Sequence, residues 1–141
     1  MSTIEHHTFY YQGEHRPIEL CNTEEVAAGV SCAAYEFTGE TAYCLAIITM
    51  KPFARMPIQV VRGGLVTFEE VITGDEGTRL RVLRAGKYEV VQSGPHIPST
   101  PILPSDVMQW TAGPKGAKFS EVCWPPFEEG RFETLDEWPN R

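Results

Sequence analysis

The sequence predicts a single all-β domain built as a barrel or sandwich of short antiparallel strands. Runs rich in Val, Ile, Thr and aromatic residues alternate with turn residues along most of the chain. Eleven prolines and twelve glycines punctuate these runs, and no long stretch has the 3.6-residue periodicity of an amphipathic helix. The length of 141 residues and the hydrophobic fraction of 42% are those of one globular domain with one core.

The elements are expected in three parts. Residues 1–30 should form an N-terminal arm with one short helix, because Asn22 or Thr23 can cap the segment TEEVAA and Gly29 can end it. Residues 31–127 should form the barrel, and residues 128–141 a polar C-terminal tail on its outside. The strands expected in the barrel are Ser31–Phe37, Ala42–Met50, Ile58–Val61, Leu65–Thr73, Thr78–Leu83, Tyr88–Gln92, Val107–Thr111 and Lys118–Trp124.

A proline-rich segment, PHIPSTPILP, allows two interpretations. Its prolines recur every three residues, which is the period of a polyproline II helix and of SH3 ligands. Because the segment lies inside the strand pattern, we favour a rigid loop with Ile97, Ile102 and Leu103 packed inward. A scaffold protein that binds partners through this segment is the weaker alternative.

Charge and cysteine content restrict the classes of partner. The net charge is -7 and no local basic tract is present, so the surface repels phosphate backbones and we expect no nucleic-acid partner. The N-terminus lacks a basic start followed by an apolar stretch, and the longest apolar run is too short to span a bilayer. Four cysteines without CxxC spacing predict free thiols. Together these features predict a cytoplasmic protein without a membrane partner.

Four segments follow one another in an order known from a large family of barrels. Ile47–Pro57 is similar to the strand and Pro-rich loop that begin the first motif of this family. Glu70–Gly77 is similar to the part of that motif in which a Glu is followed by a Gly. Ile102–Trp110 is similar to a second motif, and Glu121–Phe127 to a last strand with a Pro-Pro-Phe exit. The chain thus resembles the cupin superfamily over residues 45–127. The resemblance implies a double-stranded β-helix barrel around a small-molecule site, and a homodimer formed through sheet edges.

The positions at which the resemblance implies metal ligands contain no histidine. Metal cupins bind their ion through two His separated by one residue, then a Glu and a later His. The corresponding positions are Gln59 and Val61, or alternatively Gly64 and Val66, followed by Glu70 and Met108. One carboxylate and one thioether hold a divalent ion poorly. We therefore predict no metal and no other cofactor.

Glu70 is the first candidate catalytic residue. It shares one strand face with Phe68, and if that face lines the barrel, desolvation raises the pKa of Glu70 and suits it to acid–base catalysis. A structural pairing with an Arg is the alternative, and Glu69 is the inward residue if the register slips by one. His96 is the second candidate because it titrates near neutral pH, although a solvated loop histidine is the simpler interpretation.

Further residues are expected to bind the substrate. Arg55 and Arg62 flank the barrel mouth in the cupin-like arrangement and can clamp a carboxylate or phosphate. Aromatic side chains can form an apolar pocket wall, although plain core packing is the alternative. A lone Cys123 is usually inert packing. The complete expected set is Gln59, Arg55, Arg62, Phe68, Tyr88, Met108, Trp110 and Cys123.

Two hypotheses of function follow. The first is a metal-independent enzyme that acts on a small organic molecule inside the barrel by acid–base chemistry, as an isomerase, epimerase, cyclase or lyase. The second is a non-catalytic barrel that binds a small molecule, which the loss of the metal ligands favours directly. A cavity with an inward carboxylate favours the first, a cavity without a titrating group the second, and a filled core favours the scaffold.

Overall fold

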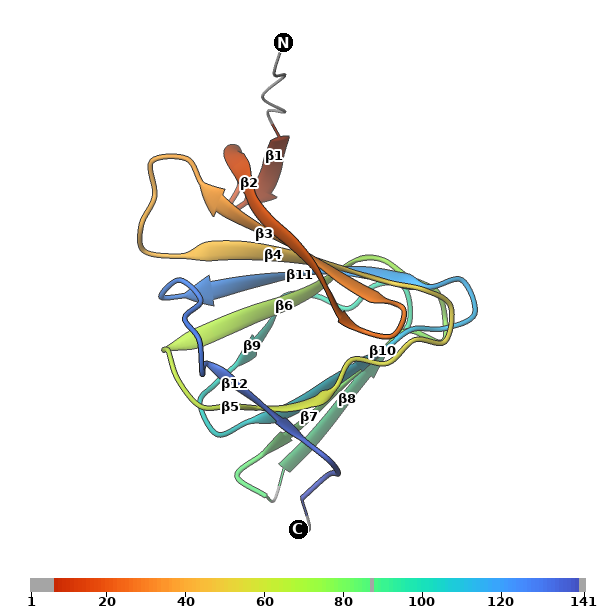
Figure 1. Ribbon diagram of the computed structural model, residues 1–141. Helices are drawn as coiled ribbons and strands as arrows, with labels where there is room; N and C mark the ends of the chain where they lie inside the picture. The colour runs from red at the N-terminus through yellow and green to blue at the C-terminus, as the bar shows by residue number, and fades with distance from the viewer. Residues whose placement is uncertain (1–6, 87, 140–141) are drawn as a thin grey trace.

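The computed structural model describes residues 7–86 and 88–139, which form two antiparallel sheets and no helix (Figure 1). The larger sheet has the strand order β1-β2-β3-β4-β11-β6-β9 and the smaller one β12-β5-β10-β7-β8. The strands are β1 (His7–Tyr11), β2 (Glu14–Ala27), β3 (Val30–Phe37), β4 (Cys44–Met50), β5 (Ile58–Val61), β6 (Val66–Thr73), β7 (Arg79–Arg84), β8 (Tyr88–Ser93), β9 (Thr100–Ile102), β10 (Val107–Thr111), β11 (Ala117–Trp124) and β12 (Phe132–Leu135). The predicted all-β class is confirmed. No helix long and apolar enough to cross a bilayer is present among the described residues.

The short helix expected before Gly29 is wrong. These residues continue the long strand β2, which pairs with β3 in a register that places Glu24 opposite Cys32. Gly29 has a φ of 75° and turns the chain from β2 into β3, so it closes a hairpin and does not cap a helix. Backbone pairing along β2 replaces a two-turn helix, which is marginal on its own because helix nucleation is unfavourable.

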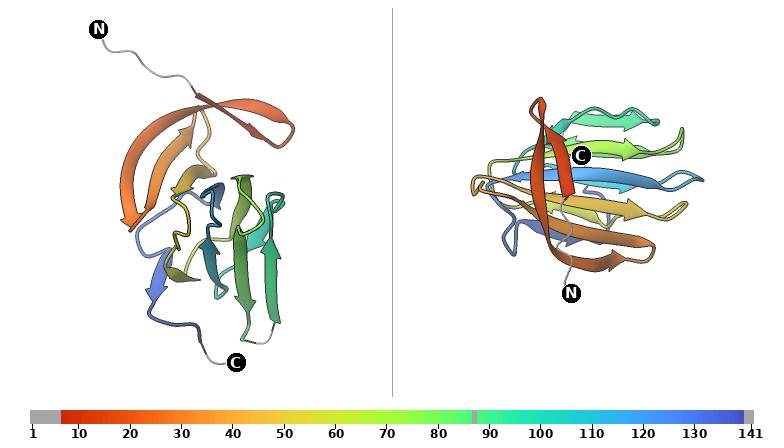
Figure 2. Two further views of the ribbon diagram at one scale, coloured as in Figure 1. Left: turned by 90° about the vertical axis from the view of Figure 1, so that its right-hand side faces the viewer. Right: turned by 90° about the horizontal axis from the view of Figure 1, so that it is seen from above.

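Both faces of the larger sheet are covered. On the inner face, Trp110 and Phe119 stack at 4.3 Å in the main core, between the two sheets. On the outer face, the N-terminal strands β1 and β2 cross the sheet, as the view from above shows (Figure 2). Aromatic residues from β1 pack there, and Trp124 Nε1 donates a hydrogen bond to the Tyr11 hydroxyl at 2.9 Å. Both faces of the central strands therefore carry apolar side chains.

The proline-rich segment lies against the main core. Ile97 and Ile102 are buried as predicted, whereas Leu103 is exposed. Thr100–Ile102 form the edge strand β9, which pairs with β6. The interpretation as a structured segment of the barrel agrees with this placement.

The C-terminal segment contributes to the sheet. Phe132–Leu135 form β12, which pairs with β5, and the Trp138 ring lies 3.9 Å from the Arg81 guanidinium carbon. Arg131 is buried, and its guanidinium donates hydrogen bonds to the carbonyl oxygens of Pro125, Val66 and Trp124 at 2.6, 3.0 and 2.9 Å. This segment is therefore more than the polar tail expected over residues 128–141, because one buried arginine ties it to the larger sheet.

Replacing Gly64 with Ala is expected to destabilise the protein more than replacing Gly13 with Ala. Both glycines have a φ near 80°, at +80° and +82°, so either alanine incurs backbone strain of about 1–2 kcal/mol. A Cβ at Gly64 also collides with the Arg131 guanidinium, whereas nothing lies within 4 Å at Gly13. We expect an extra cost of about 1–3 kcal/mol at Gly64, measured by denaturant unfolding. Equal costs at the two positions would contradict the fixed placement of Arg131.

Candidate functional site

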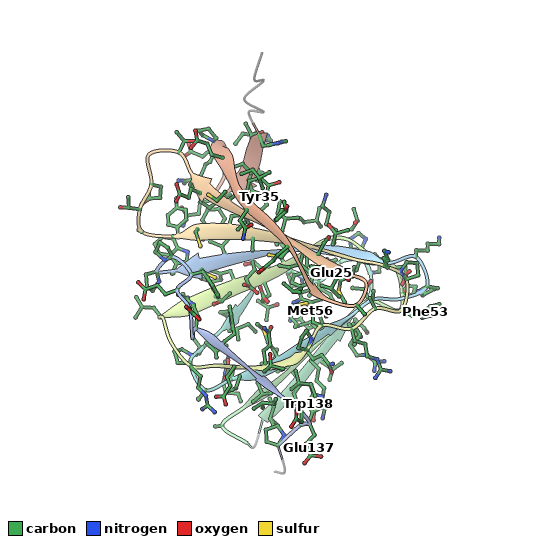
Figure 3. The ribbon with its side chains drawn as sticks, in the orientation of Figure 1. Glu25, Tyr35, Phe53, Met56, Glu137 and Trp138 are labelled. Atoms are coloured by element: carbon green, nitrogen blue, oxygen red, sulfur yellow. The ribbon has the colours of Figure 1, made fainter. Side chains whose placement is uncertain are left out.

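A cavity of about 610 Å³ lies between the two sheets. One wall consists of residues of β2, β3, β4 and β11, which include the inner-face residues Ala34, Ala46 and Glu121, and the other of residues from β5 and β12. Figure 3 labels two of the lining residues, Tyr35 on β3 and Met56 just before β5. The volume lies in the range of small-molecule sites. Cys21, Glu24 and Phe127 are among the lining residues that are exposed, so the cavity opens to solvent on one side.

Small residues at the middle of the larger sheet create the space. Direct cross-strand pairing aligns one row of inward residues across five strands, namely Asn22, Ala34, Ala46, Glu121 and Glu69. In the next inward row, two residues along the strands, Cys32 takes the place of Ala34 and Ile48 that of Ala46, and Phe119 lies opposite Ile48. These larger side chains pack in the main core. Because alanine does not reach the opposite sheet, the row leaves a hollow whose end is closed by Glu121.

Two buried carboxyl groups meet at this closed end. Glu121 on β11 lies directly opposite Glu69 on β6, and their exposed fractions are 8% and 0%. Burial raises the pKa of both groups, and the neighbouring charge of Glu121 raises that of Glu69 further, to well above its usual range. Trp110 Nε1 donates a hydrogen bond to Glu69 Oε1 at 3.4 Å.

Glu69 holds its proton to higher pH than Glu121 does, because its pKa is raised more strongly. An ionised Glu69 would leave its Oε2 without a hydrogen-bond donor in a buried place. A protonated Glu69 donates to Glu121 instead, and this hydrogen bond lowers the pKa of Glu121 against the effect of burial. The charge of the buried Arg131 also lowers the pKa of Glu121. Of the two groups, Glu121 at the cavity wall therefore ionises first, with the fully buried Glu69 behind it.

All four cysteines of the chain line the cavity as free thiols. Burial raises the pKa of Cys32 to about 11. Hydrogen bonds from Cys123 and from the backbone N–H of Phe127 lower the pKa of Cys44 to about 7. Thiols in one cavity thus differ strongly in their tendency to ionise.

The lining is acidic. Besides Glu121, the side chains of Glu24, Glu36 and Glu40 contribute carboxylates, and no Lys, Arg or His is among the described residues that line the cavity. Gln59 on β5 and Thr134 on β12 add neutral polar groups from the opposite wall. This charge distribution favours neutral or cationic ligands and disfavours anionic ones.

The comparison with known proteins rests on structure. No protein-family model matches the sequence, and no curated protein matches it. The Bacillus subtilis oxalate decarboxylase structure at pH 4.6 matches with a TM-score of 0.67 and 14% identity, over 96% of this chain and 33% of that chain. The Lactobacillus farciminis oxalate decarboxylase formate complex matches with a TM-score of 0.64 and 16% identity, over 96% and 38%. The chain has the cupin fold. The chain spans about a third of the length of the decarboxylase chains it matches.

The residues at the positions where the resemblance implies metal ligands do not form a metal site. Gln59 lines the cavity, but Glu70 is exposed on the outer face of the sheet and Met108 is buried in the main core. No group of three His, Cys, Asp or Glu side chains among the described residues could hold a metal ion. The reactive groups of this cavity are therefore its carboxyl and thiol groups.

The inward position predicted for Glu70 is wrong, and the alternative Glu69 is the inward residue. The face shared by Phe68 and Glu70 is the outer one, where Phe68 packs against the cluster that contains Leu45 and Val122. His96 is exposed and does not line the cavity. Both candidates for acid–base catalysis thus lie away from the cavity, and the carboxyl pair stands in their place.

The remaining predicted residues fall into three groups. Gln59 and Cys123 line the cavity, and Trp110 contacts the carboxyl pair from the core side. Arg55 and Arg62 are exposed and do not line the cavity. Arg62 is engaged in an ion pair with Glu133, with 2.6 Å between Nε and Oε2. Tyr88 belongs to β8, and its side chain lies outside the described part of the structure.

Sequence reasoning missed Glu121, and a signal for it was present. In AKFSEVCW the residues Ala117, Phe119, Glu121 and Cys123 alternate with the others, and this face is the inward one. A carboxylate between Phe119 and Cys123 on one strand face indicates a buried acid. Ala34 and Ala46 carried no such signal, because a cavity depends on how alanines from different strands align.

Proposed function

We propose that this cupin binds a neutral or cationic small organic molecule in its cavity and transfers a proton to or from it through Glu121. The supporting observation is the carboxyl pair, in which Glu121 stands at the cavity wall and shares a hydrogen bond with the buried acid Glu69. Isomerisation, epimerisation, cyclisation and elimination all need proton transfer and no net oxidation.

The pair supplies both halves of such a reaction. Glu121 as a carboxylate accepts a proton from a C–H or O–H group of the substrate, while the Glu69 proton remains hydrogen-bonded behind it. Glu121 then returns the proton to a different substrate atom, so the pair ends as it began. Because Glu121 is only 8% exposed, a proton that it has accepted exchanges slowly with bulk water between the two steps.

The charge class of ligand gives the first experiment. We expect thermal-shift measurements to show stabilisation by members of a panel of neutral and amine-bearing small molecules and none by oxalate or other small dicarboxylates, since four carboxylates line the cavity. Native mass spectrometry of the purified protein would identify any small molecule that remains bound. Stabilisation by dicarboxylates alone would contradict the proposal.

Catalysis itself is tested with the identified ligand. Replacing Glu121 with Gln should keep binding and lower turnover by about 10²–10⁴-fold, because the amide cannot exchange the proton. Glu36→Gln is the matched control, since Glu36 also lines the cavity but is exposed and has no buried acid behind it. Unchanged turnover in Glu121→Gln would remove Glu121 from the mechanism. Binding without any turnover in the unaltered protein would favour a non-catalytic binding barrel.

A further inference from the structure

Two of the cavity thiols stand directly opposite each other. Cys44 on β4 pairs with Cys123 on β11 in the antiparallel register, and both side chains line the cavity. Directly opposed residues on antiparallel strands have Cα atoms about 4.5–5.5 Å apart, which lies inside the range that disulfides span. A bond between these two sulfur atoms therefore needs side-chain rotation and no rearrangement of the sheet.

The surroundings of the two thiols assign them different roles. Cys44 is partly exposed, and its Sγ accepts hydrogen bonds from the Phe127 N–H at 3.2 Å and from the Cys123 thiol. These donors stabilise the Cys44 thiolate. Cys123 is only 1% exposed, and donation to Cys44 together with burial raises its pKa. Cys44 is thus the attacking sulfur and Cys123 the one that resolves.

We propose that Cys44 and Cys123 form a reversible thiol–disulfide site that reacts with small organic disulfides entering the cavity. The Cys44 thiolate attacks one sulfur of the small disulfide, which forms a mixed disulfide and releases one thiolate. Cys123 then loses its proton to that thiolate and attacks the Cys44 sulfur, which releases the second small thiol. Relative to the dithiol form, the protein loses two protons and two electrons, and the small disulfide gains them and becomes two thiols.

The other two cysteines lack this arrangement. Cys32 stands opposite Ile48 on β4 and opposite Glu24 on β2, so no thiol is its cross-strand partner. Cys21 is exposed at a register shift of β2, where the pairing passes from Leu20 to Asn22. Both nevertheless line the same cavity, so they provide controls that encounter the same reagent.

Oxidation also affects the neighbouring acid pair. The Cys123 Sγ lies 3.8 Å from Glu121 Oε1, so its single S–H proton can be donated to either Cys44 or Glu121, and donation to Glu121 lowers the pKa of that carboxyl group. A Cys44–Cys123 disulfide has no S–H proton, so this donor is lost and Glu121 binds its proton more tightly. The dithiol is therefore placed to couple the redox state of its surroundings to the protonation of the cavity.

The test exposes the full chain to cystamine, a small cationic disulfide that suits the acidic lining, and follows the products by intact-mass and peptide mass spectrometry. The expected final product is about 2 Da lighter than the reduced protein, contains no cysteamine, and links Cys44 to Cys123. Cys123→Ser should stop at a cysteamine adduct on Cys44, and Cys44→Ser should form no link. Cys21→Ser should behave as the unaltered protein. The rate of the first step should rise with pH around a midpoint of about 7.

Three results would overturn the proposal. They are a link that involves Cys21 or Cys32, a stable adduct on the unaltered protein, and a Cys44 that does not react. A second measurement uses the unaltered chain and therefore does not depend on whether the variants fold. With limiting iodoacetamide, Cys44 should be alkylated before the other cysteines, and earlier alkylation of Cys32 or Cys123 would equally contradict the proposal.

Discussion

Replacing Glu69 with Gln is expected to stabilise the protein by about 1–3 kcal/mol at pH 8, because Glu69 is fully buried and its charged form has no donor at Oε2. Glutamine mimics the protonated acid, since its amide can donate to Glu121 while its carbonyl accepts from Trp110. The variant should therefore keep the hydrogen bonds of the pair. It should lose only the free-energy cost of holding Glu69 protonated in the folded state at alkaline pH.

The pH dependence follows from the raised pKa of Glu69. Above the ordinary pKa of 4.5 the unfolded chain releases this proton while the folded protein keeps it, so the folded state binds more protons. The stability of the unaltered protein should therefore fall as the pH rises above about 4.5, until the folded-state pKa is reached. Glu69→Gln should remove that part of the decline. Chemical denaturation at a series of pH values measures both curves.

Glu70→Gln is the matched control for this experiment. Glu70 is the next residue of β6 and is exposed on the opposite face, so its replacement should leave the stability within about 0.5 kcal/mol at every pH. A pH-dependent gain in Glu70→Gln, or none in Glu69→Gln, would contradict the assignment of the buried proton.

The fold class could be predicted from the sequence, whereas the face of each strand that points into the barrel could not. Turn residues and short apolar runs indicated the barrel because they depend on local chemistry. The alternation in LVTFEEVIT places Phe68 and Glu70 on one face, but it does not say which face is inside. The outer face of β6 is itself covered, since Phe68 packs in the cluster beneath the N-terminal strands. With apolar residues on both faces, the usual rule that the apolar face is inward gives no answer.

Long-range pairing explains the other differences. The segment before Gly29 has a helix-like local sequence, yet it forms β2 because β3 offers it a complete set of backbone partners. Arg131 belongs to a polar segment, yet its guanidinium is buried against backbone carbonyl groups that only the folded sheet brings together. Charged residues of this kind are read as solvent-exposed from sequence, since their partners are distant in the chain.

Replacing Ala46 with Phe is expected to fill the cavity with no loss of stability. In a packed core, an added aromatic ring forces strain and costs about 1–3 kcal/mol. Ala46 instead faces a cavity of about 610 Å³, so a ring can be buried there with a gain of about 1–2 kcal/mol. The sign of the stability change therefore separates an open barrel from a filled one, and denaturant unfolding measures it.

The same variant should close access to the cavity thiols. Cys44 is two residues before Ala46 on the same face of β4, so the ring should slow the alkylation of Cys44 by iodoacetamide by about tenfold or more. Ala33→Phe is the control, because Ala33 points to the opposite face of the sheet, where it pairs with Ile47, and it does not line the cavity. Alkylation of Cys44 should be unchanged in that control. If Ala46→Phe is destabilised and Cys44 reacts as before, the hollow left by the alanine row is too small to admit a ligand, and the proposed site for small molecules fails with it.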